Sequence, residues 1–150
     1  MTLNIETVGV IGAGQMGAGI AEVAAQAGMI VSLTDVAEER INAALATING
    51  HLSRQVAKGQ IDEAERKAIL DRIRVAPTFD KLGDCDLVIE AASENEEVKR
   101  KIFASLRPFL KPETIVASNT SSISITSTSW IAETKHLTRI SAPFTWLSAS

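Results

Sequence analysis

The chain has 150 residues, of which 45% are hydrophobic and 22% charged, and its formal net charge is −3. This length suits one domain with a substantial core, and the composition is that of a globular rather than a disordered protein. Because acidic and basic residues are interspersed, a nucleic-acid partner and an anionic membrane surface are not expected.

The chain contains no run of about 20 apolar residues, which a membrane-spanning helix requires, and no N-terminal secretory signal pattern. Its single cysteine, Cys85, cannot form an internal disulfide and suits a reducing compartment, so we expect a cytoplasmic protein. No histidine or cationic cluster lies near Cys85 in the sequence to stabilise a thiolate. We therefore expect Cys85 to be a small, half-buried residue before a strand rather than a catalytic group.

The first elements predicted along the chain are a strand, a helix and a second strand. Residues 8–11 are apolar and mostly β-branched, which is typical of a strand buried on both faces of a parallel sheet. Residues 29–34 predict the second strand, which ends at Asp35. Between them a helix that ends at Gly28 is predicted by the spacing of Met16, Ile20, Val23, Ala24 and Ala27. Together these elements make one βαβ unit.

A charged helical region spans residues 38–74 and is divided at Gly59. Its two halves each carry an apolar stripe, the first made of Ile41, Leu45, Ile48, Leu52 and Val56, the second of Ile61, Ala64, Ala68, Ile69 and Ile73. This pattern predicts a helical hairpin inserted after the second strand, which is longer than the single helix that a minimal nucleotide-binding unit needs.

Strands and helices continue to alternate through the rest of the chain. A weak strand is predicted near Val75 and a strong one at residues 86–91, followed by a helix and by strands at residues 115–118 and 137–140. The inner face of that helix is expected to carry Val98, Ile102, Leu106 and either Phe109 or Leu110. The alternation predicts an α/β domain with a mostly parallel sheet and helices on both faces.

The turn after the first strand has the pattern Gly-x-Gly-x-x-Gly, formed by Gly12, Ala13, Gly14, Gln15, Met16 and Gly17. In this setting Gly12 makes a tight turn, Gly14 lets the backbone approach a pyrophosphate, and Gly17 lets the helix pack closely on the strand. The N–H groups and positive dipole end of the helix favour an anionic ligand. The pattern predicts a doubly wound, Rossmann-type fold that binds a dinucleotide; the alternative is a tight turn that binds nothing.

An acidic residue at the end of the second strand indicates which dinucleotide is bound. Asp35 lies 18 residues after Gly17, where a carboxylate accepts hydrogen bonds from the adenosine ribose hydroxyls and repels the 2′-phosphate of NADP. Arg40 lies close enough in sequence to hold such a phosphate, but we favour a solvated position on a helix face for it. NAD is therefore expected rather than NADP.

Several separate segments resemble the L-3-hydroxyacyl-CoA dehydrogenases, especially the short-chain 3-hydroxybutyryl-CoA enzymes. The segments are residues 10–21, 86–91, 111–115 and 117–122, and the resemblance covers roughly residues 5–140. The most discriminating segment is Asn119-Thr120-Ser121-Ser122, which follows a predicted strand. The resemblance implies an NAD-binding domain at residues 1–140, followed by an atypical tail at residues 141–150.

The resemblance also implies roles for five residues. Ser121 would contact the 3-hydroxyl or 3-keto oxygen of the substrate, although a serine there is also a good helix cap, and Asn119 would lie at the nicotinamide end of the cofactor. Glu94 and Lys99 match a cofactor-contacting pair of the family; an exposed, salt-bridged first helical turn explains them equally well. Lys58 resembles a lysine that contacts CoA, but a lysine before a helix-ending glycine also favours the helix dipole.

The sequence departs from the family after its last predicted strand. The family pattern there is Gly-x-His-Phe-x-Asn-Pro, whose histidine is the general base and is oriented by a glutamate further on. That pattern, the glutamate and the family's helical C-terminal domain are absent from this chain, and His51 and His136 are expected at the surface. General-base catalysis contributes about 10² to 10⁴ in rate, so we expect this chain alone to be largely inactive. Apolar surface that the helical domain covers is expected to cause self-association.

These features predict the NAD-binding domain of a dehydrogenase that transfers hydride between NAD and a short 3-hydroxyacyl-CoA in fatty-acid or butanoate metabolism. One alternative is another NAD-dependent 3-hydroxyacid dehydrogenase, against which the segment at residues 119–122 and the long hairpin argue. The other alternative is a non-catalytic module that binds a nucleotide or a partner. No metal site is expected.

Overall fold

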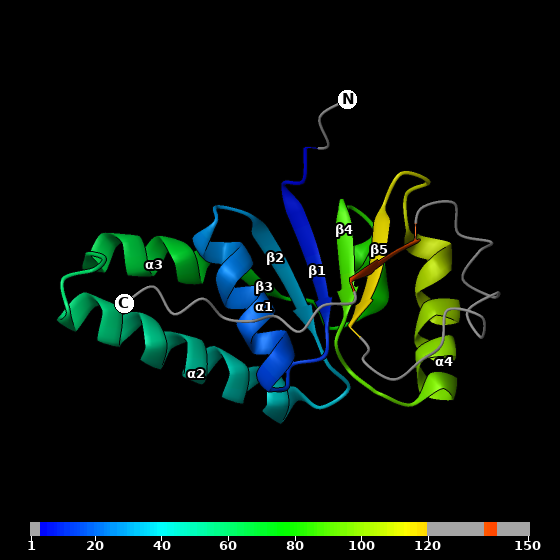
Figure 1. The fold of residues 1–150 in the computed structure, drawn as a ribbon, viewed down its shortest axis with the longest axis horizontal. Coiled ribbons are helices and arrows are strands. Elements are labelled where there is room, and N and C mark those ends of the chain that lie inside the picture. The colour runs from blue at the N-terminus through cyan, green and yellow to red at the C-terminus, as the bar shows by residue number, and fades with distance from the viewer. Residues whose placement is uncertain (1–3, 120–136, 141–150) are drawn as a thin grey trace.

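The computed structural model describes residues 4–119 and 137–140, and these residues form one parallel sheet of six strands (Figure 1). The order across the sheet is β3-β2-β1-β4-β5-β6, and every neighbouring pair is parallel. The strands are β1 (Thr7–Ile11), β2 (Ile30–Thr34), β3 (Ile73–Val75), β4 (Leu87–Glu90), β5 (Ile115–Asn119) and β6 (Leu137–Ile140). This is the doubly wound arrangement that the sequence predicts, with the order reversing between β1 and β4.

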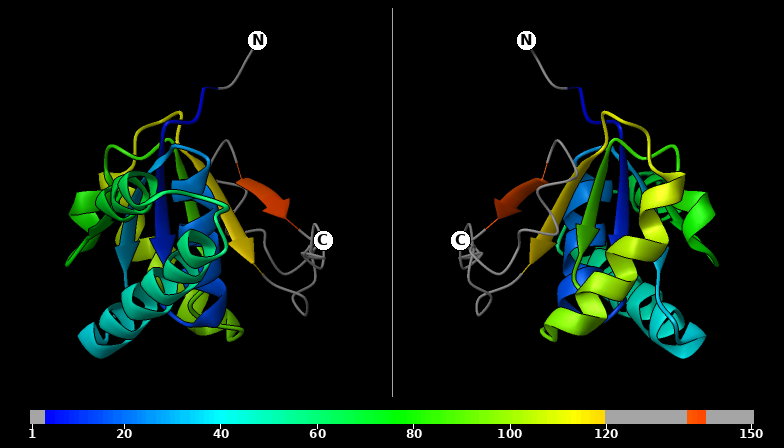
Figure 2. Two further views of the ribbon diagram at one scale, coloured as in Figure 1. Left: turned by 90° about the vertical axis from the view of Figure 1, so that its left-hand side faces the viewer. Right: turned by 90° about the vertical axis from the view of Figure 1, so that its right-hand side faces the viewer.

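The helices cover both faces of the sheet, as the two side views show (Figure 2). They are α1 (Gln15–Gln26), α2 (Glu38–Ala57), α3 (Glu63–Asp71) and α4 (Glu96–Leu106), with short 3₁₀ turns η1 (Phe79–Leu82) and η2 (Arg107–Phe109). One core lies between β1, β2 and the group α1, α2 and α3, and a second lies beneath η1 and α4. The hairpin of α2 and α3 confirms the predicted insertion after the second strand.

Strand β1 divides its side chains between these two cores. Val8 and Val10 are buried in the first core, whereas Ile11 is buried in the second. A Cβ added at Gly9 would lie 3.2 Å from the Cys85 sulfur, so the second core needs a small residue there. Cys85 is fully buried rather than half-buried as predicted, and burial raises the pKa of its thiol to about 11. The thiol therefore stays protonated near neutral pH, which agrees with a packing role.

Two details of the predicted helices are wrong. Ile73 belongs to β3 rather than to the hairpin, because α3 ends at Asp71. On α4 the predicted inner residue Val98 is 42% exposed and its neighbour Lys99 is only 2% exposed, whereas Ile102 and Leu106 lie on the buried face as predicted. The crossover between β3 and β4, for which no element was predicted, contains the single turn η1. None of the helices within residues 4–119 has the length and apolar character that a membrane crossing requires.

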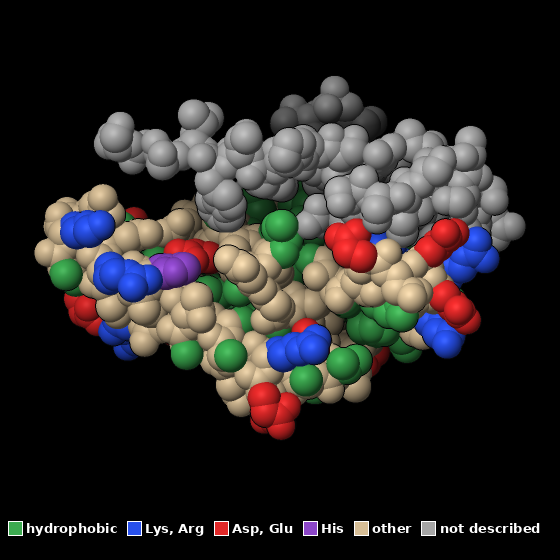
Figure 3. Space-filling view, turned by 60° about the horizontal axis from the view of Figure 1, so that its bottom comes forward, with side chains coloured by type: hydrophobic (Ala, Val, Ile, Leu, Met, Phe, Trp, Pro, Cys, Tyr) green, Lys and Arg blue, Asp and Glu red, His purple; other side chains and the backbone are tan. Residues whose placement is uncertain are grey.

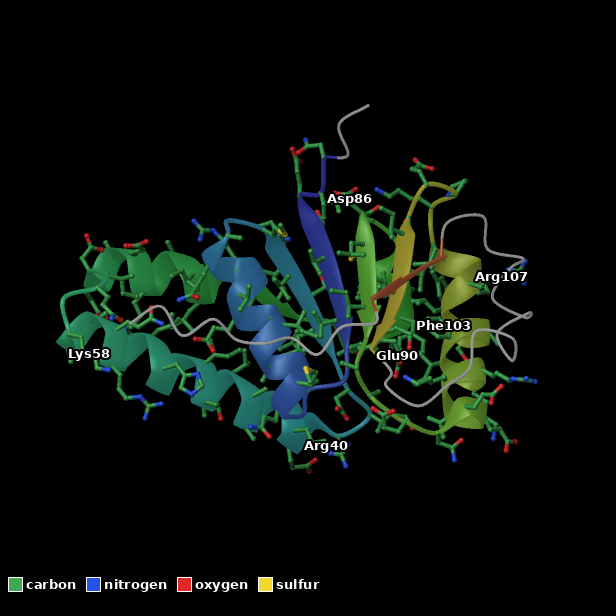
Figure 4. The ribbon with its side chains drawn as sticks, in the orientation of Figure 1. Arg40, Lys58, Asp86, Glu90, Phe103 and Arg107 are labelled. Carbon is green, nitrogen blue, oxygen red and sulfur yellow. The ribbon has the colours of Figure 1, made fainter. Side chains whose placement is uncertain are left out.

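A polar contact joins β1 to β4 at the amino ends of the strands. The Asp86 carboxylate, labelled in Figure 4, accepts the N–H groups of Glu6 at 2.9 Å and Thr7 at 3.2 Å, and it pairs with Lys111 at 3.0 Å. The Glu6 N–H and then the Lys111 ammonium lower the pKa of Asp86 below its usual range. These contacts favour the ionised carboxylate, so they stabilise the fold at neutral pH.

We expect Asp86→Asn to lower the melting temperature at neutral pH and to have a smaller effect in acid. The stabilisation by Asp86 is complete above its unfolded pKa of about 3.9 and is lost as the pH falls through the lower pKa of the folded state. Thermal unfolding of both chains, followed by circular dichroism across this pH range, would measure whether their melting temperatures converge in acid. A difference in melting temperature that is the same at every pH would contradict the assignment.

Candidate functional site

The candidate site begins at the turn between β1 and α1, at the carboxyl edge of the sheet. Gly12 has a φ of +107°, and its N–H donates to the Thr34 carbonyl at 2.8 Å. A Cβ at Gly12 would lie 2.7 Å from the Cα of Ala92 and 2.8 Å from the Ala91 carbonyl carbon. The turn after β4 is therefore packed directly against the glycine turn, and only glycine fits between them.

The other two glycines of the pattern differ sharply in their surroundings. A Cβ at Gly17 would lie 1.7 Å from the carbonyl oxygen of Gly12, so α1 approaches the turn as closely as its backbone allows. No atom of the described residues lies within 4 Å of a Cβ placed at Gly14. The space beside Gly14 is therefore open to a ligand, in agreement with the roles that the pattern predicts.

The amino end of α1 is suited to an anion. Its N-cap residue is Gly14, which gives no side-chain cap, and its first turn contains no acidic residue. The other three α-helices of the described residues each carry two acidic residues in the first turn. Because acidic side chains compete with a bound anion for the positive helix end, α1 is the helix best placed to hold a phosphate group.

Asp35 connects the end of β2 to this turn. Its Oδ2 accepts the Ala13 N–H at 2.8 Å and its Oδ1 accepts the Ala37 N–H at 3.0 Å, and the side chain is only 5% exposed. Each carboxylate oxygen keeps a second lone pair for a ribose hydroxyl. The Arg40 guanidinium lies 3.9 Å from Oδ1 and is 64% exposed, so it is a helix-surface residue that faces Asp35. The anchoring of the glycine turn by Asp35 is a contact that sequence reasoning missed.

The segment between β4 and α4 places the predicted pair Glu94 and Lys99 in different surroundings. Glu94 is exposed before α4, whose N-cap Asn95 accepts the N–H groups of Glu97 and Val98. Lys99 is buried and paired with the fully buried Glu90, so the alternative of an exposed salt-bridged turn is wrong for Lys99. Glu90 was not predicted as a site residue; the signal was a carboxylate inside an otherwise apolar strand segment.

The remaining predicted site residues are spread over the chain. Asn119 is the last residue of β5, at the same edge as the glycine turn, and Ser121 lies outside the described residues, as does the tail at residues 141–150. Lys58 caps the far end of α2, 18 residues after Arg40, which corresponds to about 27 Å of helix (Figure 4). The structure therefore does not bring Lys58 close to the glycine turn.

The carboxyl edge as a whole carries charges of both signs. Figure 3 looks toward this edge and shows Lys and Arg side chains interspersed with Asp and Glu, beside apolar side chains in the middle of the face. Within residues 4–119 and 137–140, no group of three or more His, Cys, Asp or Glu side chains could hold a metal ion. The hairpin histidine, His51, contacts Glu22 of α1 at 2.9 Å, away from this edge.

The strand order, the glycine turn and the carboxylate at the end of β2 define a Rossmann-type dinucleotide-binding domain. Residues 7–141 match the family described as "3-hydroxyacyl-CoA dehydrogenase, NAD binding domain". The chain belongs to this family, and its cofactor is NAD. The open space at Gly14 and the acid-free end of α1 fit the pyrophosphate of that cofactor.

Individual relatives carry names of the same kind. A 3-hydroxybutyryl-CoA dehydrogenase from Bradyrhizobium diazoefficiens is 60% identical over 126 residues, which are 84% of this chain and 43% of the relative. A 3-hydroxyadipyl-CoA dehydrogenase from Escherichia coli is 43% identical over 93% of this chain and 29% of the relative. The crystal structure of (S)-3-hydroxybutyryl-CoA dehydrogenase from Ralstonia eutropha has a TM-score of 0.85 at 36% identity and covers 91% of this chain and 48% of that one. The chain thus spans less than half the length of these proteins.

Proposed function

We propose that this chain supplies the NAD-binding part of an enzyme that transfers hydride between NAD and the 3-hydroxyl or 3-keto group of a short acyl-CoA, in fatty-acid or butanoate metabolism. The observation that carries the proposal is the meeting of three features at one edge: the open space at Gly14, the acid-free end of α1 and the Asp35 carboxylate. The names of the relatives support the acyl-CoA substrate. We also propose a cytoplasmic location, which the reduced, buried Cys85 supports.

The proposed roles follow the order of the strands. NAD, when bound, accepts or donates the hydride at its nicotinamide ring. Asp35 would hold the adenosine ribose, whereas Asn119 would lie at the nicotinamide end because β5 belongs to the other half of the sheet. Ser121, two residues further on, would contact the substrate oxygen, and Glu94 would line the cofactor site from the segment after β4. Lys99, which is 2% exposed and paired with Glu90, would support that segment from the core rather than contact NAD. Lys58 would reach only the distal part of CoA.

Cofactor choice tests the role of Asp35. We expect NADH to bind at least about tenfold more tightly than NADPH, because a nearly buried carboxylate repels the 2′-phosphate and Arg40 already faces that carboxylate. Fluorescence titration of the chain with each nucleotide would measure the two Kd values. Equal affinities would show that Asp35 does not contact the ribose, and tighter binding of NADPH would assign Arg40 to its phosphate.

Turnover separates an enzyme part from a binding module. We expect this chain to bind NADH but to reduce acetoacetyl-CoA little or not at all, because neither His51 nor His136 matches the family's general base. We further expect self-association in sedimentation, since Met16, Val36 and Val98 are exposed near the carboxyl edge. Turnover like that of a complete dehydrogenase would contradict the first expectation, and a stable monomer the second. A chain that binds NADH without any affinity for acyl-CoA would favour a non-catalytic module.

A further inference from the structure

A buried polar cluster lies at the carboxyl ends of β4 and β5, and the family assignment does not explain it. Its members are Glu90 at the end of β4, Lys99 on α4 and Ser118 on β5, which are 0%, 2% and 8% exposed. Glu90 and Ser118 are direct partners in the register of the two strands. Figure 4 shows Glu90 at the lower end of its strand, on the side of α4.

The cluster satisfies the Glu90 carboxylate completely. Oε2 accepts the Lys99 ammonium and the Ser118 hydroxyl, the latter at 2.8 Å, and the ammonium also donates to the Ser118 oxygen at 3.1 Å. Oε1 accepts the N–H groups of Ala92 at 3.0 Å and Ser93 at 3.1 Å. One side chain thus joins a strand, a helix, a second strand and the turn after β4.

That turn forms one wall of the glycine turn. The Ala91 N–H donates to the Ile11 carbonyl at 2.7 Å, and the backbone of Ala91 and Ala92 leaves room only for hydrogen at Gly12. Residues 91 and 92 therefore form the side of the glycine turn that faces the ends of β4 and β5. Ala92 itself is exposed, so its position is set by the Glu90 carboxylate rather than by burial.

The strand order indicates which half of the cofactor this wall faces. A dinucleotide lies across the point where the order reverses, with one half on each side. Asp35 at the end of β2 assigns the adenosine half to the β1-β2-β3 side, so the nicotinamide half belongs to the ends of β4 and β5. The cluster lies at the ends of these two strands.

We propose that Glu90 is a positioning residue for the nicotinamide half of NAD, which it controls by holding residues 91–93 through the cluster with Lys99 and Ser118. This inference rests on the proposed NAD site. A buried ion pair is weak evidence for stability, because well-packed apolar side chains of similar size often stabilise a core at least as well. Apolar residues cannot accept the N–H groups of Ala92 and Ser93, as the Glu90 carboxylate does.

A pair of double variants isolates that contact. Glu90→Leu with Lys99→Met removes the acceptor without leaving a buried charge, whereas Glu90→Gln with Lys99→Met keeps an acceptor oxygen. In the first variant we expect the Kd for NADH to rise by about tenfold and the Kd for ADP, which lacks the nicotinamide half, to stay within about twofold. The glutamine variant should recover most of the NADH affinity.

Asp86→Asn is the matched control, because it removes the ion pair at the opposite end of the same strand and should leave the ratio of the two Kd values unchanged. Circular dichroism would confirm that each variant is folded. If the leucine variant does not fold, Ser118→Ala provides the test, and we expect its Kd to rise by about threefold for NADH but not for ADP. An unchanged ratio, or equal losses for NADH and ADP, would overturn the positioning role. Absence of NADH binding by the unsubstituted chain would instead overturn the proposed function.

Discussion

Replacing Gly14 by valine is expected to weaken NADH binding by at least about a hundredfold, or ~2.7 kcal/mol, while the domain remains folded. The backbone at Gly14 has φ −74° and ψ −168°, a conformation that any residue adopts, and the described residues leave the space around its Cβ open. Valine would therefore fit the protein but occupy the space that a pyrophosphate needs beside the amino end of α1. Because valine is a poorer N-cap than glycine, we expect a stability loss of about 1 kcal/mol or less.

Fluorescence titration with NADH and urea unfolding of the same samples would separate the two effects. Gly14→Ala provides a graded comparison, since a methyl group intrudes less than an isopropyl group. Wild-type NADH affinity in the valine variant would remove the glycine turn from the binding site. A valine variant that fails to fold would contradict the open space that surrounds Gly14.

Replacing Gly17 by alanine is expected to act mainly on stability, with a loss of about 3 kcal/mol in the free energy of unfolding. The new Cβ would lie 1.7 Å from the Gly12 carbonyl oxygen, which is backbone and has little freedom to move. The gain of about 1 kcal/mol in helix propensity is too small to offset this overlap. For a domain of this size the melting temperature should fall by about 10 °C.

Gly50→Ala is the matched control for that experiment. Gly50 lies on the exposed side of α2, and a Cβ there meets no atom of another described segment within 4 Å. We therefore expect alanine at this position to stabilise the domain by about 0.5–1 kcal/mol, through the same helix propensity and without overlap. A Gly17→Ala chain as stable as the Gly50→Ala chain would show that α1 does not pack as tightly on the turn as the structure indicates.

The sequence predicts those parts of the fold and site that depend on neighbouring residues. The unit from β1 to β2 and its glycine turn are encoded within about thirty residues, and their elements agree with the structure because apolar runs, turn residues and helix end all indicate them. The predicted inner face of α1 is wrong in part, since Met16 and Val23 are each 44% exposed and small residues are buried instead. The first inner residue of α4 was predicted wrongly because Val98 and Lys99 both precede Ile102 at helical spacing. Hydrophobicity favours Val98 for the buried position, whereas in the structure Lys99 occupies it because its ammonium pairs with the buried Glu90 carboxylate.

That acceptor could not be inferred without the register of the sheet. Glu90 is 9 residues from Lys99 and 28 from Ser118, and only the pairing of β4 with β5 brings the three together. The anchoring of the Ala13 N–H by Asp35 is hidden for the same reason, since it joins residues 22 apart across a strand end. Local pattern identifies the candidate groups, but tertiary pairing determines their partners.

The seam between β1 and β4 also bears on how the chain folds. Strands β1, β2 and β3 follow one another in the sequence, whereas the contact of Asp86 with the Glu6 N–H joins β4 to β1 and closes a loop of 80 residues. Contacts so distant in sequence form late, because the entropy of loop closure must be overcome before they add stability. During synthesis the stretch through β3 emerges and can collapse on its own before β4 is made. The contact of β4 with the glycine turn is therefore expected to form late, and NAD recognition with it.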